Sequence, residues 1–187
     1  AQVRSTSGKT GREVAEEILH ANGIYDVDVV KGEGFLTDHY DPKKKVVCLS
    51  PANFDRPSVA GTAIAAHEVG HAIQHQQGYA FLRFRSALVP LANLGSSLSY
   101  MIIMLGIILT AMGSAFGSTA LWIGAGLMSL AVLFSIVTLP VEFDASSRAM
   151  KQITALNIVN EKEYKHAKKV LSAAAMTYVA ATATAVA

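Results

Sequence analysis

Residues 86–141, SALVPLANLGSSLSYMIIMLGIILTAMGSAFGSTALWIGAGLMSLAVLFSIVTLPV, contain no Lys, Arg, Asp or Glu. This run of 56 uncharged residues is long enough to cross a bilayer twice, because each crossing needs about 20 apolar residues. We expect crossings at roughly residues 88–112 and 120–139, joined by a turn over residues 113–119. The sequence therefore predicts a transmembrane helical hairpin; an unusually hydrophobic soluble core is the alternative.

A second apolar stretch begins at about Val170 and continues to Ala187. It is rich in Ala and Thr and has no polar flank at its end, so we interpret it as a third transmembrane helix that is cut short. The first residue is not Met, which leaves open a further membrane anchor upstream of Ala1.

The first 85 residues have the pattern of a small soluble α+β domain. A helix is predicted over residues 11–20, begun by a capping box of Thr10 and Glu13, and strand patterns follow at residues 27–30, 35–40 and 45–49. We therefore expect an α+β fold divided into a soluble domain (1–85), the hairpin (86–141), a membrane-proximal helix (142–169) and the start of a further transmembrane helix (170–187).

The motif His67-Glu68-Val69-Gly70-His71 lies on a predicted helix that Ser58 or Thr62 can cap and that ends near Gly78. Residues four apart share a helix face, so His67 and His71 can reach one metal ion. Glu68 projects about 100° away, as a general base acting on metal-bound water requires. The alternative is a pair of surface histidines on an amphipathic helix.

A catalytic zinc site usually has three protein ligands and one open position, so a third ligand is needed. Our choice is Glu142, at the start of a predicted helix that Pro140 caps or kinks. Asp144 is the alternative ligand, or a partner that orients an imidazole. A two-helix hairpin returns the chain to the side it left, so His67, His71 and Glu142 share one face of the membrane. Glu142 could also simply be the first charge outside a membrane segment.

The distribution of positive charge predicts the side of the membrane on which the site residues lie. The turn of the hairpin is uncharged, and the basic residues lie on the side of the motif: Lys43, Lys44, Lys45, Arg83, Arg85, Arg148 and Lys151. The positive-inside rule then places the site in the cytoplasm, and the single Cys48 is compatible with a reducing compartment. A net charge of +2 makes no case for nucleic acid, and anionic lipid headgroups explain the basic flanks better.

Four segments together resemble the YugP-type family of membrane-bound neutral zinc metallopeptidases: LTDHYDP at 36–42, AAHEVGHAIQ at 65–74, GYAFLR at 78–83 and LPVEFDAS at 139–146. The resemblance implies a bacterial multi-pass membrane protein with an additional N-terminal membrane helix. It also implies a gluzincin-like fold related to the HtpX and CAAX prenyl proteases.

By position, the resemblance makes His67, His71 and Glu142 the metal ligands and Glu68 the catalytic base. Ser146 stands where the HtpX-like group has an Asp that supports an active-site His, a role for which Asp144 could substitute.

We therefore expect a zinc metalloendopeptidase with one Zn²⁺ per chain, acting on membrane or membrane-proximal proteins at the cytoplasmic face of the plasma membrane. Candidate donors to the reacting oxyanion are His39, Tyr40, Arg148 and Tyr178. The alternatives are an intramembrane protease, a non-catalytic zinc-binding membrane adaptor and a zinc hydrolase of non-peptide substrates.

Overall fold

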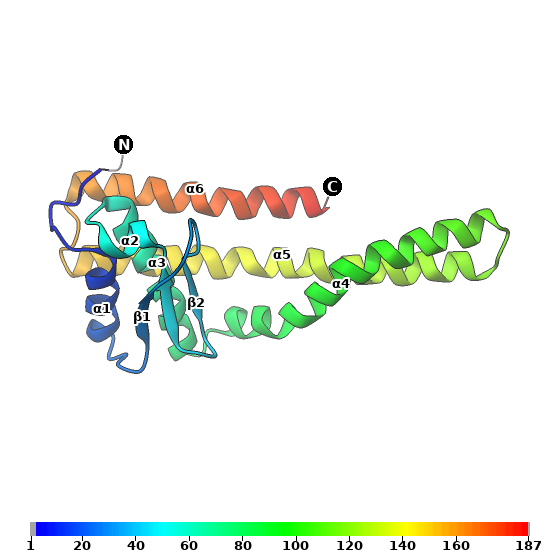
Figure 1. Cartoon of the computed structure of the whole chain (residues 1–187), viewed down its shortest axis with the longest axis horizontal. Helices are drawn as coiled ribbons and strands as arrows, with labels where there is room; N and C mark the ends of the chain where they lie inside the picture. Colours follow the sequence, from blue (N-terminus) through cyan, green and yellow to red (C-terminus); the bar gives the residue numbers. More distant parts are fainter. Residues whose placement is uncertain (1–2, 187) are drawn as a thin grey trace. The chain divides into compact units, whose positions relative to one another are not determined.

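The computed structural model describes residues 3–186, which form a mostly helical chain with one small sheet (Figure 1). The elements, in chain order, are α1 (Gly11–Ala21), β1 (Asp28–Lys31), β2 (His39–Asp41), β3 (Val46–Leu49), α2 (Pro51–Asp55), α3 (Val59–Gln76), α4 (Ala80–Ala111), α5 (Phe116–Ala155) and α6 (Glu161–Val186). Helices and a small sheet confirm the predicted mixture of elements.

The described residues form two compact units. We call the first the site unit; it comprises the residues up to Tyr79 together with Val141–Thr177. The second, the hairpin unit, comprises Ala80–Pro140 together with the residues from Tyr178 onward. The four-segment division expected from the sequence follows membrane boundaries, and it stays a prediction.

Helix α1 begins with the predicted capping box. The backbone N–H of Glu13 donates to Thr10 Oγ1 at 3.3 Å, and the N–H of Thr10 donates to Glu13 Oε2 at 2.8 Å. Asn22 caps the other end, and Gly23 follows with φ of 68°, a backbone conformation that Gly adopts without strain. Both ends of α1 are thus set by local sequence.

The sheet has the strand order β1-β3-β2. Strands β2 and β3 are antiparallel, as the predicted hairpin requires, and β1 pairs with β3 in parallel. Strand β2 is shorter than expected, since residues 35–38 lie outside it. Val47 and Leu49 of β3 are buried and alternate with partly buried neighbours, so one face of the sheet points into the core.

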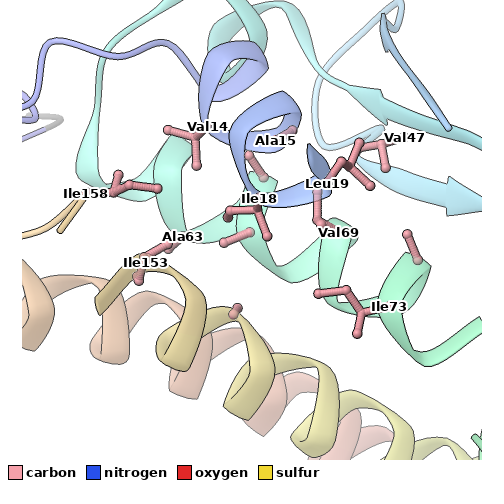
Figure 2. Packing of buried hydrophobic residues seen from close by; sticks show 14 of the residues in the cluster. Val14, Ala15, Ile18, Leu19, Val47, Ala63, Val69, Ile73, Ile153 and Ile158 are labelled. Carbon is pink, nitrogen blue, oxygen red and sulfur yellow. The ribbon is translucent and has the colours of Figure 1, made fainter. Parts of the chain in front are cut away.

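The core of the site unit joins segments from both ends of its sequence (Figure 2). Apolar side chains of α1, β3 and α3 pack with Ile153 of α5 and with Ile158, which follows α5. Fully buried members include Val14, Ile18, Val47, Ala63, Val69 and Ile153. Helix α3 is therefore surrounded by apolar groups on several sides, which fixes the direction of the His-Glu motif.

The hairpin unit contains α4 and the first part of α5, which run side by side (Figure 1). Glycines lie at their contacts: a Cβ on Gly95 would lie 2.8 Å from Leu127 O, and one on Gly124 would lie 2.5 Å from Ile103 Cγ1. Such close approaches of small residues are common between membrane helices. Within residues 3–186, three helices, α4, α5 and α6, are long and apolar enough to cross a membrane.

Two details of the predicted helices need correction. Helix α5 begins at Phe116, so the turn after α4 is shorter than residues 113–119. No new helix begins at Pro140, because that residue lies inside the continuous helix α5. The missing N–H of Pro140 removes one backbone bond, which the neighbouring turns of the helix tolerate here.

Candidate metal centre

Helix α3 carries the motif, and its start is fixed by Ser58. The Ser58 hydroxyl accepts a hydrogen bond from the backbone N–H of Gly61 at 3.0 Å, so Ser58 rather than Thr62 is the cap. Thr62 is fully buried within the helix. Gly78, with φ of 63°, follows the last turn where the sequence predicted the end.

His67, His71 and Glu142 meet at one point between α3 and α5. Nε2 of His67 lies 3.0 Å from Glu142 Oε2, and Nε2 of His71 lies 3.6 Å from Glu142 Oε1. The ligand atoms of the three residues all lie within 4.8 Å of one another. His71 and Glu142 are buried and His67 is partly buried. The structure therefore brings the three predicted ligands together, and Asp144 is not part of the group.

Gly70 allows the two helices to come this close. A Cβ atom added to Gly70 would lie 2.6 Å from the backbone oxygen of Ala145, closer than real Cβ atoms come to other groups. Ala145 is itself fully buried and adds only a methyl group to the contact. The small residue within the motif thus sets the distance between α3 and α5, and hence the distance from His67 and His71 to Glu142.

Each histidine is held by a second side chain through Nδ1. Nδ1 of His67 lies 3.1 Å from the hydroxyl of Ser146, and Nδ1 of His71 lies 2.9 Å from Oε1 of Gln74. Ser146, where the resemblance led us to expect an Asp, therefore contacts one of the predicted ligands, His67. Gln74 had no predicted role, and only its position three residues after His71 on the same helix could have suggested the contact with that imidazole.

Asp144 supports the site from one step further away. Its Oδ2 accepts a hydrogen bond from Gln74 Nε2 at 2.7 Å and from Arg148 Nε at 2.5 Å. Arg148 also donates to Gln77 and lies over the ring of Tyr79. Asp144 therefore contacts Gln74, and Gln74 contacts His71. Asp144 can orient the imidazole only indirectly, whereas the prediction had it contact the imidazole itself.

The predicted oxyanion donors lie in different places. Arg148 is paired with Asp144, the hydroxyl of Tyr40 lies 2.8 Å from His75 Nδ1, and Nδ1 of His39 lies 2.7 Å from Thr37 O. Tyr178 belongs to the hairpin unit. The contact with Tyr40 gives His75 a structural place on α3, while the oxyanion donor itself stays a prediction.

Two groups on α3 have shifted pKa values. Burial raises the pKa of Glu68, and the carboxylates of Glu142 and Asp38 add to this effect, while the neighbouring histidines oppose it. Burial lowers the pKa of His71, but the carboxylate of Glu142, 3.6 Å away, and the charge of Glu68 outweigh burial and leave that pKa raised. A carboxylate with a raised pKa is a stronger base, as proton abstraction requires.

The donor set is one that catalytic zinc sites use. It consists of two imidazole nitrogens and one carboxylate oxygen, and three protein ligands leave one position open. A buried carboxylate beside two imidazoles is also compensated by the charge of a cation. The residues present therefore fit zinc.

Comparisons with known proteins agree with this chemistry. The family model described as "Putative neutral zinc metallopeptidase" matches residues 1–187. The chain is 42% identical over 181 residues to "Putative membrane protease YugP" of Bacillus subtilis (strain 168), covering 97% of this chain and 78% of that protein. No solved structure matches. The chain belongs to this family of zinc metallopeptidases.

Proposed function

We propose that this family member is a membrane-bound zinc metalloendopeptidase in which His67, His71 and Glu142 hold the metal ion. One observation carries the proposal: three ligand atoms from α3 and α5, which lie 75 residues apart at His67 and Glu142, gather within 4.8 Å. Such a meeting of two imidazoles and a carboxylate is unlike a chance pair of surface histidines.

The reaction we propose is hydrolysis of a peptide bond. Zinc supplies Lewis-acid polarisation of oxygen at such a site. Glu68 accepts the proton of the attacking water as oxygen bonds to the scissile carbonyl carbon, and it then delivers that proton to the leaving amine as the C–N bond breaks. The raised pKa of Glu68 supports both steps, because the group must take up a proton and release it again.

The location of the site supports a class of substrate. Residues 3–186 contain three helices of membrane-spanning length, and Glu142 lies on the same helix as one of the apolar segments. We therefore propose membrane proteins or their juxtamembrane segments as substrates, cleaved at the cytoplasmic face of the plasma membrane. The basic residues near the apolar segments support this orientation and contact with anionic lipids. A gluzincin-like fold remains part of the proposal.

Elemental analysis of detergent-purified protein tests the metal site. We expect about one zinc ion per chain in the wild type, loss of that zinc in Glu142→Ala, and full retention in Glu68→Gln. Zinc retained in Glu142→Ala would move the third ligand elsewhere. A wild type without zinc would contradict the proposal.

Cleavage then separates an enzyme from a zinc-binding adaptor. Random quenched fluorogenic peptides, supplied with protein in vesicles, should be cleaved by wild type and not by Glu68→Gln, although both bind zinc. Zinc binding without cleavage of any peptide would favour the adaptor or a non-peptide hydrolase.

A further inference from the structure

Gln74 is a fully buried polar side chain at the contact between α3 and α5. Its amide oxygen lies 2.9 Å from Nδ1 of His71. Its amide nitrogen donates to the backbone oxygen of Val141 at 2.9 Å and to Asp144 Oδ2 at 2.7 Å. Both N–H groups and the carbonyl of the amide are therefore used, as a buried amide requires.

The surroundings allow only one orientation of this amide. The backbone oxygen of Val141 is an acceptor, and Asp144, ion-paired with Arg148, is an ionised acceptor. A reversed amide would turn its oxygen toward both acceptors and leave buried groups without donors, at a cost of about 1–3 kcal/mol for each. The oxygen of Gln74 must therefore face His71, and a carbonyl oxygen cannot donate a proton.

We propose that Gln74 is a positioning residue that fixes His71 in the tautomer protonated at Nδ1. Nε2 then keeps its lone pair and faces the point where the three ligand atoms meet. The distance of 3.6 Å between this Nε2 and Glu142 Oε1 agrees, because it exceeds normal hydrogen-bond length. The inference deepens the proposed function and rests on it only in naming Nε2 as the zinc ligand atom.

His67 provides the contrast. Its Nδ1 faces the hydroxyl of Ser146, which can either donate or accept, and its Nε2 lies 3.0 Å from Glu142. Ser146 therefore permits both tautomers of His67, whereas Gln74 permits one tautomer of His71. The protein therefore fixes the tautomer of His71, whereas the tautomer of His67 can change with what its Nε2 contacts.

Nitrogen NMR of the full chain in detergent tests the tautomer directly. The metal-free protein, labelled with ¹⁵N-histidine and held at alkaline pH to keep imidazole neutral, is compared with His71→Gln to assign the resonance. We expect His71 to carry its proton on Nδ1. A proton on Nε2 of His71 in the wild type would overturn the proposal, whether or not the protein binds zinc.

Variants of Gln74 test the consequence for zinc. We expect Gln74→Leu to populate both tautomers of His71 and to weaken zinc binding, measured by competition with a chelator, about 10–100-fold. Gln76→Leu makes the same chemical change at an exposed position of α3 and should change neither. A folded Gln74→Leu protein with unchanged tautomer and zinc affinity would contradict the role of Gln74.

Two further outcomes are separable. If Gln74→Leu fails to fold, as limited proteolysis would reveal, the double variant Gln74→Glu with Asp144→Asn keeps an acceptor toward His71 and a donor toward residue 74, and it removes only the donor to Val141 O. We expect that double variant to keep the Nδ1 proton, and its loss would count against the proposal. A wild type that has the expected tautomer but binds no zinc would contradict the proposed function and leave the positioning role intact.

Discussion

Both units of this chain have a glycine where two helices come close together, but the polar groups near the two contacts are hydrogen-bonded differently. In the site unit, Gly70 lets α3 approach the backbone of Ala145, and in the hairpin unit, Gly95 lets α4 approach the backbone of Leu127. In the site unit, Gln74 donates across to α5. In the hairpin unit, the hydroxyls of Ser135 and Thr138 donate back to their own helix.

The difference shows what converts a close helix contact into a site. Glycine brings backbones together in both units, but the Ser and Thr hydroxyls of α4 and of the first part of α5 donate within their own helices. The contact between α3 and α5 instead satisfies polar groups across the interface, so their positions depend on the partner helix. Changes to the site unit should therefore affect metal binding, and matched changes to the hairpin unit should not.

Zinc itself should produce the largest difference between the units. At a free concentration of about 1,000 times its Kd, zinc should stabilise the site unit by about 4 kcal/mol, because it binds only the folded site. Hydrogen exchange read by mass spectrometry should show slower exchange in α3 after zinc is added to chelator-treated protein, with no change in α4. Equal protection of both helices would contradict a site confined to α3 and α5.

Gly70→Ala should have the next largest effect. The added methyl group collides with the backbone of Ala145, so we expect a loss of about 1–3 kcal/mol in stability and weaker zinc binding. Gly95→Ala, with a Cβ 2.8 Å from Leu127 O, should perturb the hairpin but leave zinc affinity unchanged. Gly126→Ala, which meets no atom within 4 Å, is the silent control. Chelator competition measures each affinity.

Asp144→Asn should have a smaller effect on zinc affinity, about fivefold or about 1 kcal/mol, since Asn can still accept from Gln74 but no longer pairs with Arg148. Thr138→Val removes a hydroxyl that bonds only within α5, so it should leave zinc affinity as in the wild type. An equal loss in both variants would show that zinc binding responds to general destabilisation.

Ser146 should give the smallest effect. Ser146→Ala should weaken zinc binding by about 0.5–1 kcal/mol, because it removes the single hydrogen bond to His67 Nδ1. Ser146→Asp should tighten zinc binding, since a carboxylate only accepts and favours a proton on Nδ1. Tighter zinc binding by Ser146→Ala would contradict a supporting role of Ser146 at His67.

Local sequence patterns predicted much of this structure. The capping box of α1 and the apolar segments of α4 and α5 are decided by neighbouring residues, so capping chemistry and periodicity predicted them. For the cap of α3 the sequence predicted Ser58 or Thr62, and the structure shows Ser58. The three candidate ligands could be predicted because zinc needs particular donor atoms at fixed spacing, and few carboxylates follow the motif.

Features that depend on two distant segments were missed. Gln74 contacts α5 through atoms about 70 residues away, so its role could not be deduced from α3 alone. Gly70 could be noticed as a residue without a side chain, but nothing in the sequence identified Ala145 as the group it faces. Pro140 was expected to begin a helix, yet the continuous apolar segment before it kept α5 intact.

The division of the site unit into two separate stretches of chain has a consequence for the order of folding during synthesis. Residues up to Tyr79 emerge from the ribosome long before Val141–Thr177, and both stretches fill one core. His67 and His71 are therefore synthesised before the whole hairpin, and Glu142 only after it. Because contacts between distant segments form late, the three candidate ligands can come together only after both helices of the hairpin have been made.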